Sequence, residues 1–253
     1  MSYRGRFAPS PTGLLHLGTA RTALLAWRRA RQQKGAFFLR IEDLDAPRVV
    51  EGAEAALLRD LAWLGIDWDE APLVQSRRLP LYQAALDQLT ASGRAYPCTC
   101  SRKEIASIAS APQGDEGPVY PGVCREAPSH PGRPAAWRFR SENDPGGDFV
   151  MKRADGVFSY QLACAVDDAA MGITEVVRGE DLKPSDLRQS ALLKALGHPV
   201  PAYLHAPLML GPDGERLSKR HGSVALAELR EQGHSPEMLR AALLHPFANW
   251  PNP

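Results

Sequence analysis

The chain has 253 residues, of which 44% are hydrophobic and 23% are charged, and its formal net charge is +1. This length allows one large domain or one domain with an insertion, and the composition is typical of a globular protein. The charge excludes strong overall attraction to nucleic acid, so any RNA contact must come from a local basic face.

Membrane and secretory features are absent from the sequence. No stretch approaches about 18 consecutive apolar residues, so no membrane-spanning helix is predicted. The first residues lack the apolar core of a signal peptide, and four cysteines at uneven spacing do not indicate a secreted disulfide framework. We therefore expect a cytoplasmic protein that does not bind a membrane.

The first predicted elements are a strand at residues 3–7 and a helix from residue 17 onward. Two prolines and Gly13 fix the turn between them, because proline presets φ and glycine tolerates almost any φ. The helix points free N–H groups and the positive end of its dipole back at the strand tip, which suits a phosphate chain. His16 can donate to a phosphate oxygen there, and Gly18 lets a nucleotide approach the backbone. The alternative is an ordinary strand–turn–helix with a surface histidine.

A second strand is predicted at residues 36–41 and completes a βαβ unit. It is followed by the sequence EDLD at residues 42–45. Carboxylates at the carboxyl end of a parallel strand lie where open α/β sheets bind ligands, although Asp45 serves equally as a helix N-cap. Amphipathic helices are predicted at 51–64 and 81–92, the second with Leu81, Ala84, Ala85 and Leu89 as its buried face.

Three cysteines indicate a metal site in the region that follows, which is rich in proline and glycine. Cys98 and Cys100 have one residue between them, so they cannot easily form a disulfide with each other, but both can point at one metal. Cys124 adds a third sulfur, which leaves a tetrahedral zinc ion one ligand short. Reduced cysteines in a loop are the alternative. Cys164 lies in an apolar stretch and is expected to be a small core residue.

The second half of the chain continues the alternation of strands and helices. A buried parallel strand is predicted at 173–177, because this run is apolar and β-branched, and it leads into Arg178. Ser185 is the predicted N-cap of a helix at 185–196. The other predicted elements are strand pieces at 137–140 and 148–152 that form a hairpin around residues 144–147, a helix or strand at 162–166, a strand-like run at 203–210, and short helices at 224–229 and 236–244.

A basic cluster precedes the last two helices. Gly211 and Gly214 stand before the sequence RLSKRHG at residues 216–222. Glycines that flank a cluster of lysine, arginine and serine indicate a mobile loop that closes over phosphates. In such a loop Lys219 would neutralise the charge that builds up in a transition state. A solvated basic turn is the alternative.

Two of these segments resemble the paired signature motifs of class I aminoacyl-tRNA synthetases. The sequence HLGT at residues 16–19 resembles the HIGH-type motif, and RLSKR at residues 216–220 resembles the KMSKS-type motif. The surrounding segments narrow the resemblance to the glutamyl branch; they are RFAPSPTGLLHLGTAR at 6–21, LRIEDLDAPR at 39–48 and VVRGEDL at 176–182. The resemblance implies an α/β fold with a Rossmann-type nucleotide-binding core and a parallel sheet. It divides the chain into a first half of the core at 1–95, an inserted zinc-bearing subdomain at 96–158 and a second half of the core at 159–253.

The resemblance also implies roles for individual residues. His16 and Lys219 are the expected catalytic residues, ATP is expected as a substrate with Mg²⁺, and Glu42 is expected to face the ammonium group of L-glutamate. A fourth zinc ligand is implied at Tyr120. The expected glutamate-binding residues are Arg6, Phe7, Ala8, Pro9, Ser10, Glu42, Tyr160 and Arg178; the ATP-binding residues are His16, Gly18, Thr19 and Lys219; the motif residues are Pro9, His16, Leu17, Gly18 and Thr19 in the first motif and Arg216, Leu217, Ser218, Lys219 and Arg220 in the second; and the zinc ligands are Cys98, Cys100, Tyr120 and Cys124.

The end of the chain at Pro253 narrows the expected function. Discriminating glutamyl-tRNA synthetases continue into an anticodon-binding region, whereas this chain resembles the shorter glutamyl-Q tRNA(Asp) synthetases. That resemblance implies a monomer with one structural Zn²⁺ that activates L-glutamate with ATP and transfers it to the queuosine base in the anticodon loop of tRNA(Asp). The alternatives are a truncated glutamyl-tRNA synthetase that charges the tRNA 3′ end, a pantothenate-synthetase-like ligase, and a catalytically silent RNA-binding paralogue.

Overall fold

The structure is a computed structural model, and it describes residues 2–108, 113–114, 117–142, 147–209 and 224–245. The chain forms two compact units. This division is based on how the residues pack. The three-part division expected from the sequence is based on the function of each part, and it stays a prediction. The first unit contains Met1–Ser76, Ile173–Lys183 and Pro201–Pro253, and the second contains Arg77–Gly172 and Pro184–Val200.

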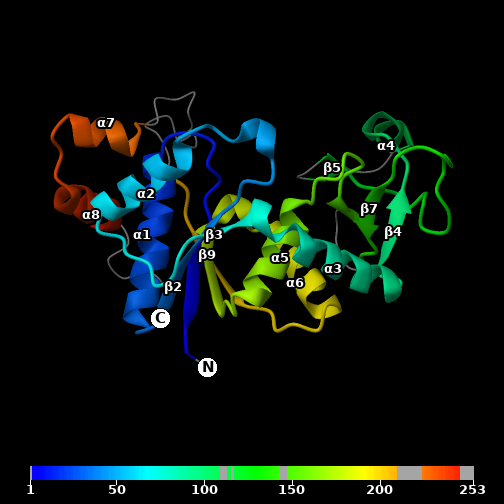
Figure 1. Ribbon diagram of the computed structural model, residues 1–253, viewed down its shortest axis with the longest axis horizontal. Helices are drawn as coiled ribbons and strands as arrows, with labels where there is room; N and C mark the ends of the chain where they lie inside the picture. The colour runs from blue at the N-terminus through cyan, green and yellow to red at the C-terminus, as the bar shows by residue number, and fades with distance from the viewer. Residues whose placement is uncertain (1, 109–112, 115–116, 143–146, 210–223, 246–253) are drawn as a thin grey trace. The chain divides into compact units, whose positions relative to one another are not determined.

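Parallel strands organise the first unit (Figure 1). Hydrogen bonds of 2.9 Å join the backbone of Arg4 to Thr174, so the strand that follows Thr174 lies beside the first strand of the chain. The predicted α/β core with a parallel sheet is therefore confirmed. Its strands are β1 (Arg4–Phe7), β2 (Ala36–Ile41) and β3 (Leu73–Val74), paired in that order, and β9 (Glu175–Gly179) paired with β10 (Ala202–Ala206).

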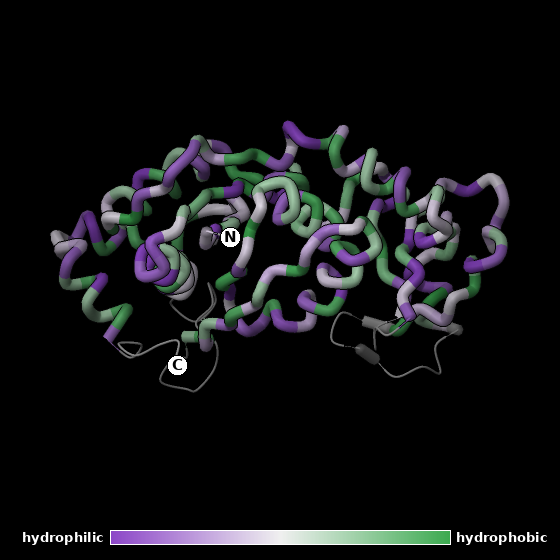
Figure 2. Tube along the Cα trace, turned by 90° about the horizontal axis from the view of Figure 1, so that it is seen from below, coloured by the Kyte–Doolittle hydropathy of each residue, from purple (hydrophilic) through white to green (hydrophobic). Residues whose placement is uncertain are grey.

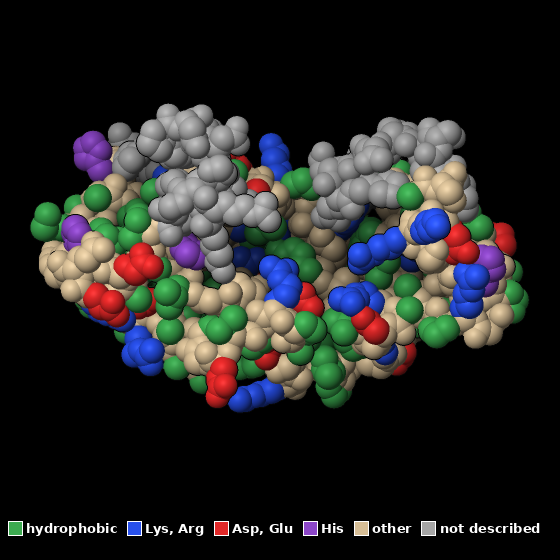
Figure 3. Space-filling model, turned by 90° about the horizontal axis from the view of Figure 1, so that it is seen from above, with side chains coloured by type: hydrophobic (Ala, Val, Ile, Leu, Met, Phe, Trp, Pro, Cys, Tyr) green, Lys and Arg blue, Asp and Glu red, His purple; other side chains and the backbone are tan. Residues whose placement is uncertain are grey.

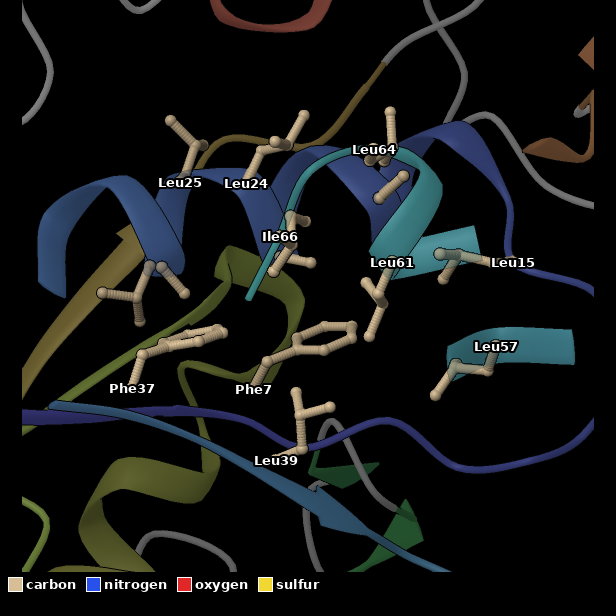
Figure 4. Packing of buried hydrophobic residues seen from close by; sticks show 14 of the residues in the cluster. Phe7, Leu15, Leu24, Leu25, Phe37, Leu39, Leu57, Leu61, Leu64 and Ile66 are labelled. Carbon is tan, nitrogen blue, oxygen red and sulfur yellow. The ribbon is translucent and has the colours of Figure 1, made fainter. Parts of the chain in front are cut away.

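Helix α1 (Leu17–Gln32) packs its apolar side on one face of these strands. Leu24 and Leu25 are fully buried and belong to the same hydrophobic cluster as the strand residues Phe7 and Phe37. In Figure 4 the two leucines project from the upper side of α1, and the two rings lie below it. Strand alternation sends every second side chain to the same face, so one helix can cover the apolar series that begins with Phe37. Leucines of α2 (Ala53–Trp63) close the other side of this core.

Two short helices complete the core of the first unit. They are α7 (Leu226–Glu231) and α8 (Pro236–Leu244), which contribute the buried residues Leu226 and Leu243. The hydroxyl of Ser235 caps α8 by accepting a hydrogen bond from the backbone N–H of Met238 at 3.2 Å. Both helices were expected from the sequence, α8 with the same bounds.

An antiparallel sheet with helices around it forms the second unit. The predicted hairpin is confirmed by the pairing of its two strands, although residues 143–146 of its turn lie outside the described residues. The strands, in sheet order, are β4 (Ala95–Cys98), β7 (Ala136–Phe139) and β8 (Phe149–Lys152), and β5 (Gln113–Gly114) pairs with β6 (Gly117–Pro118). The helices are α3 (Leu79–Ala91), α4 (Arg102–Ile108), α5 (Tyr160–Ala170) and α6 (Ser185–Ala195). Short 3-10 helices in the chain are η1 (Ala46–Arg48), η2 (Gln75–Arg78) and η3 (Glu180–Leu182).

The predicted buried face of α3 is confirmed for Ala85 and Leu89 and wrong for Leu81 and Ala84. Leu81 is 45% exposed and Ala84 is also exposed. The helix is turned because Tyr82 is fully buried and its hydroxyl donates to the buried carboxylate of Asp167 at 2.8 Å. The side chains that α3 buries are Tyr82, Ala85, Leu86 and Leu89.

Two predicted boundaries in the second half of the chain also shift. The N-cap of α6 is Pro184, and Ser185 is a buried helical residue whose hydroxyl accepts a hydrogen bond from Gln161 Nε2 at 3.0 Å. The predicted strand at 173–177 is found at Glu175–Gly179, so Arg178 lies within β9 instead of after it. Cys164 is fully buried, as expected of a small core residue.

Apolar, basic and acidic residues are mixed in the described part of the chain. Apolar and polar residues are interleaved along the described trace (Figure 2), and among the described residues no helix is both long and apolar enough to cross a membrane. On the face shown in Figure 3, Lys and Arg side chains lie interspersed with Asp and Glu. This mixture agrees with the formal net charge of +1.

Candidate active site and metal site

Backbone hydrogen bonds hold the turn between β1 and α1. The N–H of Thr12 donates to the carbonyl oxygen of Ser10 at 2.9 Å, and the N–H of Glu42 donates to that of Pro9 at 3.0 Å. Gly13 has a φ of 135°, a backbone conformation that favours glycine. The hydrogen bond between Glu42 and Pro9 joins this turn to the carboxyl end of β2. It therefore holds two segments of the predicted glutamate site next to each other.

His16 is the N-cap residue of α1 and has an extended backbone. Both of its ring nitrogens are buried, and neither has a hydrogen-bond partner among the described residues. A buried polar group without a partner costs about 1–3 kcal/mol, so this imidazole fits a bound polar ligand. The first turn of α1 holds no acidic residue and its N–H groups have no side-chain cap. The imidazole and the helix N-terminus together suit an anion.

The first turn of α1 contains Leu17, Gly18 and Thr19. Leu17 packs against the hydrophobic core, and Thr19 is exposed. A Cβ atom added to Gly18 would meet no described atom within 4 Å. The backbone of this turn is therefore open to a ligand within the described part of the chain.

The parallel strands of the first unit have one apolar face and one charged face. Apolar strand residues such as Phe7 and Leu39 point into the core beneath α1. Strand alternation directs their neighbours Arg6, Arg40 and Arg178 to the opposite face, where they are 4%, 0% and 4% exposed. Guanidinium groups can make paired hydrogen bonds to carboxylates, so this face is chemically compatible with a ligand that carries them.

Glu42 directly follows β2 and adds one carboxylate to the charged face. Its Oε1 accepts hydrogen bonds from Arg40 Nη2 at 3.0 Å and from Arg40 Nε at 3.3 Å. The side chain of Arg40 is 0% exposed and that of Glu42 is 10% exposed. Three guanidinium groups and one carboxylate therefore lie on this face, and one of the guanidinium groups is paired with that carboxylate.

The remaining predicted residues are distributed between the two units. The side chain of Phe7 belongs to the hydrophobic core, so only its backbone can meet a ligand on the charged face. In the turn that follows, Ala8 is half-buried, Pro9 is buried and Ser10 is exposed. Tyr160 begins α5 in the second unit. Residues 216–220, including Lys219, lie outside the described residues.

Three sulfur atoms gather near the end of β4 in the second unit. The Sγ atoms of Cys98, Cys100 and Cys124 all lie within 4.8 Å of one another, and those of Cys100 and Cys124 are 3.5 Å apart. The hydroxyl oxygen of Tyr120 lies 3.3 Å from Cys98 Sγ and 3.8 Å from Cys100 Sγ. Zinc with Zn–S bonds of about 2.3 Å separates sulfur ligands by about 3.8 Å in a tetrahedron. The three clustered cysteines could therefore hold a metal such as zinc, and the position of the Tyr120 oxygen fits a fourth ligand.

Ser129 adds hydrogen bonds to the sulfur cluster. Its N–H donates to Cys124 Sγ at 3.4 Å, and its hydroxyl lies 3.3 Å from both Cys100 Sγ and Cys124 Sγ. Burial raises the pKa of the Cys124 thiol, but hydrogen bonds from Ser129 and Tyr120 outweigh burial and lower this pKa to about 5. Burial raises the pKa of the Cys100 thiol and of the Tyr120 hydroxyl. The thiolate favoured at Cys124 is the form that binds a metal.

The buried carboxylate of Asp148 binds the residue that follows Cys124 in the chain. Arg125, the residue after Cys124, donates to both carboxylate oxygens of Asp148 at 2.7 Å. The Asp148 side chain is 0% exposed and also accepts from the Tyr96 hydroxyl and from the Ser141 N–H. These contacts hold the chain next to Cys124 in place.

The sequence matches the family of class I tRNA synthetases for glutamate and glutamine, catalytic domain, over residues 2–128 and 134–249. The glutamyl-Q tRNA(Asp) synthetase of Symbiobacterium thermophilum is 49% identical over 98% of this chain and 88% of its own length. That of Deinococcus radiodurans is 49% identical over 99% of this chain and 90% of its own length. The chain belongs to the glutamyl-Q tRNA(Asp) synthetase family.

Glutamyl-Q tRNA(Asp) synthetases share their core with the glutamate–tRNA ligases. Glutamate–tRNA ligase 1 of Acidithiobacillus ferrooxidans is 46% identical over 94% of this chain but only 56% of its own length. The crystal structure of a glutamate tRNA ligase from Elizabethkingia meningosepticum in complex with its amino acid matches with a TM-score of 0.80 and 30% identity. That match covers 96% of this chain and 60% of the ligase. The class I fold expected from the sequence is thus confirmed.

The sequence did not predict two residues of these sites, which are Arg40 beside Glu42 and Ser129 beside the cysteine sulfurs. Arg40 is a single charge inside an apolar strand, and its available signal was the spacing of two from Glu42, which puts both side chains on one face. No local signal distinguishes Ser129, because only the path of the chain after Cys124 brings its hydroxyl to two sulfurs.

Proposed function

We propose that this chain activates L-glutamate with ATP in the absence of tRNA and transfers the glutamyl group to the queuosine base in the anticodon loop of tRNA(Asp). The observation that carries this proposal is the 49% identity to glutamyl-Q tRNA(Asp) synthetases across 98–99% of the chain. We place the protein in the cytoplasm, since its tRNA and ATP substrates are found there, and we propose that it acts as a monomer.

In the first step an α-carboxylate oxygen of glutamate attacks the α-phosphorus of ATP. The bond from that phosphorus to the bridging oxygen breaks, and pyrophosphate leaves from glutamyl-adenylate. His16 and the N-terminus of α1 bind the phosphates, for which the buried and unpartnered imidazole is the support among the described residues. Lys219, from outside the described residues, neutralises the charge that grows on the phosphates. Mg²⁺, when bound, shields the charge of the departing pyrophosphate.

The charged face of the parallel strands positions glutamate for this attack. We assign Arg6 and Arg178 to the substrate carboxylates and Glu42 to its ammonium group. The burial of both arginines and the orientation of Glu42 by Arg40 support this assignment. Because the protein supplies no covalent partner, positioning and charge stabilisation account for the rate.

In the second step a hydroxyl of the queuosine base attacks the carbonyl carbon of the adenylate. An ester forms, AMP leaves, and the hydroxyl proton passes to solvent. We assign one structural Zn²⁺ to Cys98, Cys100, Tyr120 and Cys124, because four protein ligands leave no open position for a substrate. Its role is to hold the inserted subdomain in shape for the tRNA.

One experiment tests the transfer. The protein is incubated with radiolabelled glutamate, ATP and tRNA(Asp) that either carries or lacks queuosine. We expect label only on the queuosine-bearing tRNA, and undiminished label when that tRNA lacks its 3′-terminal adenosine. Labelling that requires the 3′-terminal adenosine, whether or not the tRNA carries queuosine, would instead establish a glutamate–tRNA ligase. The 46% identity to such an enzyme makes this the alternative to test.

A further inference from the structure

Arg40 is the largest fully buried side chain in the described part of the protein, and it is the fifth of the six residues of an otherwise apolar strand. Its neighbours Leu39 and Ile41 both belong to the hydrophobic core. A guanidinium group in this place is costly to bury unless it is paired. The ion pair with the Glu42 carboxylate, at 3.0 Å, supplies such a partner.

The contacts of Arg40 fix the direction of the Glu42 carboxylate. Two guanidinium nitrogens donate to the same oxygen, Oε1, at 3.0 Å and 3.3 Å. The backbone of Glu42 is held separately, by its N–H bond to Pro9 at 3.0 Å. A carboxylate offers about four lone-pair positions, so it can accept from Arg40 and from an ammonium group at the same time.

We infer that Arg40 is a positioning residue that orients Glu42 toward the ammonium group of the substrate and so sets the preference for an amino acid over the same diacid without the amino group. This inference rests on the proposed function. Arg40 acts through Glu42, and the substrate carboxylates are bound by other residues. A change at Arg40 therefore weakens the recognition of the ammonium group and leaves the recognition of the carboxylates in place.

The test compares glutamate with glutarate, which has both carboxylates but no ammonium group. The KM of glutamate and the inhibition constant of glutarate are measured by ATP–pyrophosphate exchange in the unchanged protein, Arg40→Met, Arg40→Lys and Glu42→Gln. We expect Arg40→Met to raise the KM of glutamate about ten- to hundredfold and to change the inhibition constant of glutarate less than about threefold. Adding Arg40→Met to Glu42→Gln should then change the ratio of the two constants no further.

Arg29→Met is the matched control, because Arg29 also forms an ion pair with a carboxylate in the first unit, at 2.8 Å to Glu175. It should leave the ratio of the two constants unchanged. If Arg40→Met raises the KM of glutamate and the inhibition constant of glutarate by the same factor, Arg40 has only a structural role and the inference is overturned. Should Arg40→Met fail to fold, the same ratio in Arg40→Lys decides, because lysine keeps the charge but cannot make the two-nitrogen contact. If the unchanged protein shows no glutamate-dependent exchange, the proposed function fails, which is a different result.

Discussion

Gly18→Ala is expected to stabilise the protein while weakening its use of ATP. Gly18 is the second residue of α1, its φ is not positive, and an added Cβ would meet no described atom within 4 Å. Alanine is favoured over glycine inside a helix by about 0.8–1.0 kcal/mol, and somewhat less near its end. For a chain of this size that corresponds to a rise in Tm of about 1–3 °C. The same methyl group would stand where we expect the phosphates to approach the backbone, so the KM for ATP should rise at least about tenfold.

Gly52→Ala gives a control with the opposite pattern. Gly52 also has no atom within 4 Å of an added Cβ, but its φ is +76°, so alanine there is strained by about 1–2 kcal/mol. We expect Gly52→Ala to lower the Tm and to leave the KM for ATP unchanged. Thermal unfolding and ATP–pyrophosphate exchange measure both quantities. A Gly18→Ala protein with a raised Tm and an unchanged KM for ATP would refute the placement of the nucleotide against this turn.

Three further predictions concern other parts of the protein. His16→Ala should lower the exchange rate by about two or more orders of magnitude, roughly 3 kcal/mol, if the imidazole binds the phosphates. The Tm should not fall, because the removed ring nitrogens have no hydrogen-bond partner among the described residues. Near-normal exchange would contradict this role of His16. Cys98→Ser should reduce bound zinc, measured by metal analysis after dialysis, and should impair transfer to tRNA more than glutamate activation; equal loss of both would argue against a local role. Asp148→Asn should cost about 2–3 kcal/mol in urea unfolding, since the amide nitrogen of asparagine cannot accept from Arg125, so one of the two hydrogen bonds is lost and the other loses its negative partner. Although burial raises the pKa of Asp148, its hydrogen bonds to Arg125, Tyr96 and Ser141 lower it below the ordinary 3.8. The stability from this carboxylate is therefore complete above the unfolded-state pKa and is lost as the pH falls through the lower folded-state value, so Asp148→Asn should flatten the stability profile below about pH 4; an unchanged acid profile would exclude this source.

The sequence by itself determined the features that depend on a few neighbouring residues. The turn of two prolines and Gly13 predicts where α1 begins, and the apolar run at 36–41 predicts β2 with the bounds that it has. The spacing of Cys98 and Cys100 predicts a shared metal, because two such thiols cannot easily bridge each other.

Only the tertiary structure decided which face each element buries and which distant side chains meet. The face of α3 is set by the bond from Tyr82 to Asp167, which is 85 residues away in the chain. The hydroxyl of Ser129 reaches two sulfurs only through the path of the loop after Cys124. Periodicity and turn chemistry act within a few residues, whereas these contacts join residues that lie far apart in the chain. Local sequence therefore predicts where elements lie, and packing decides the charges that they present together.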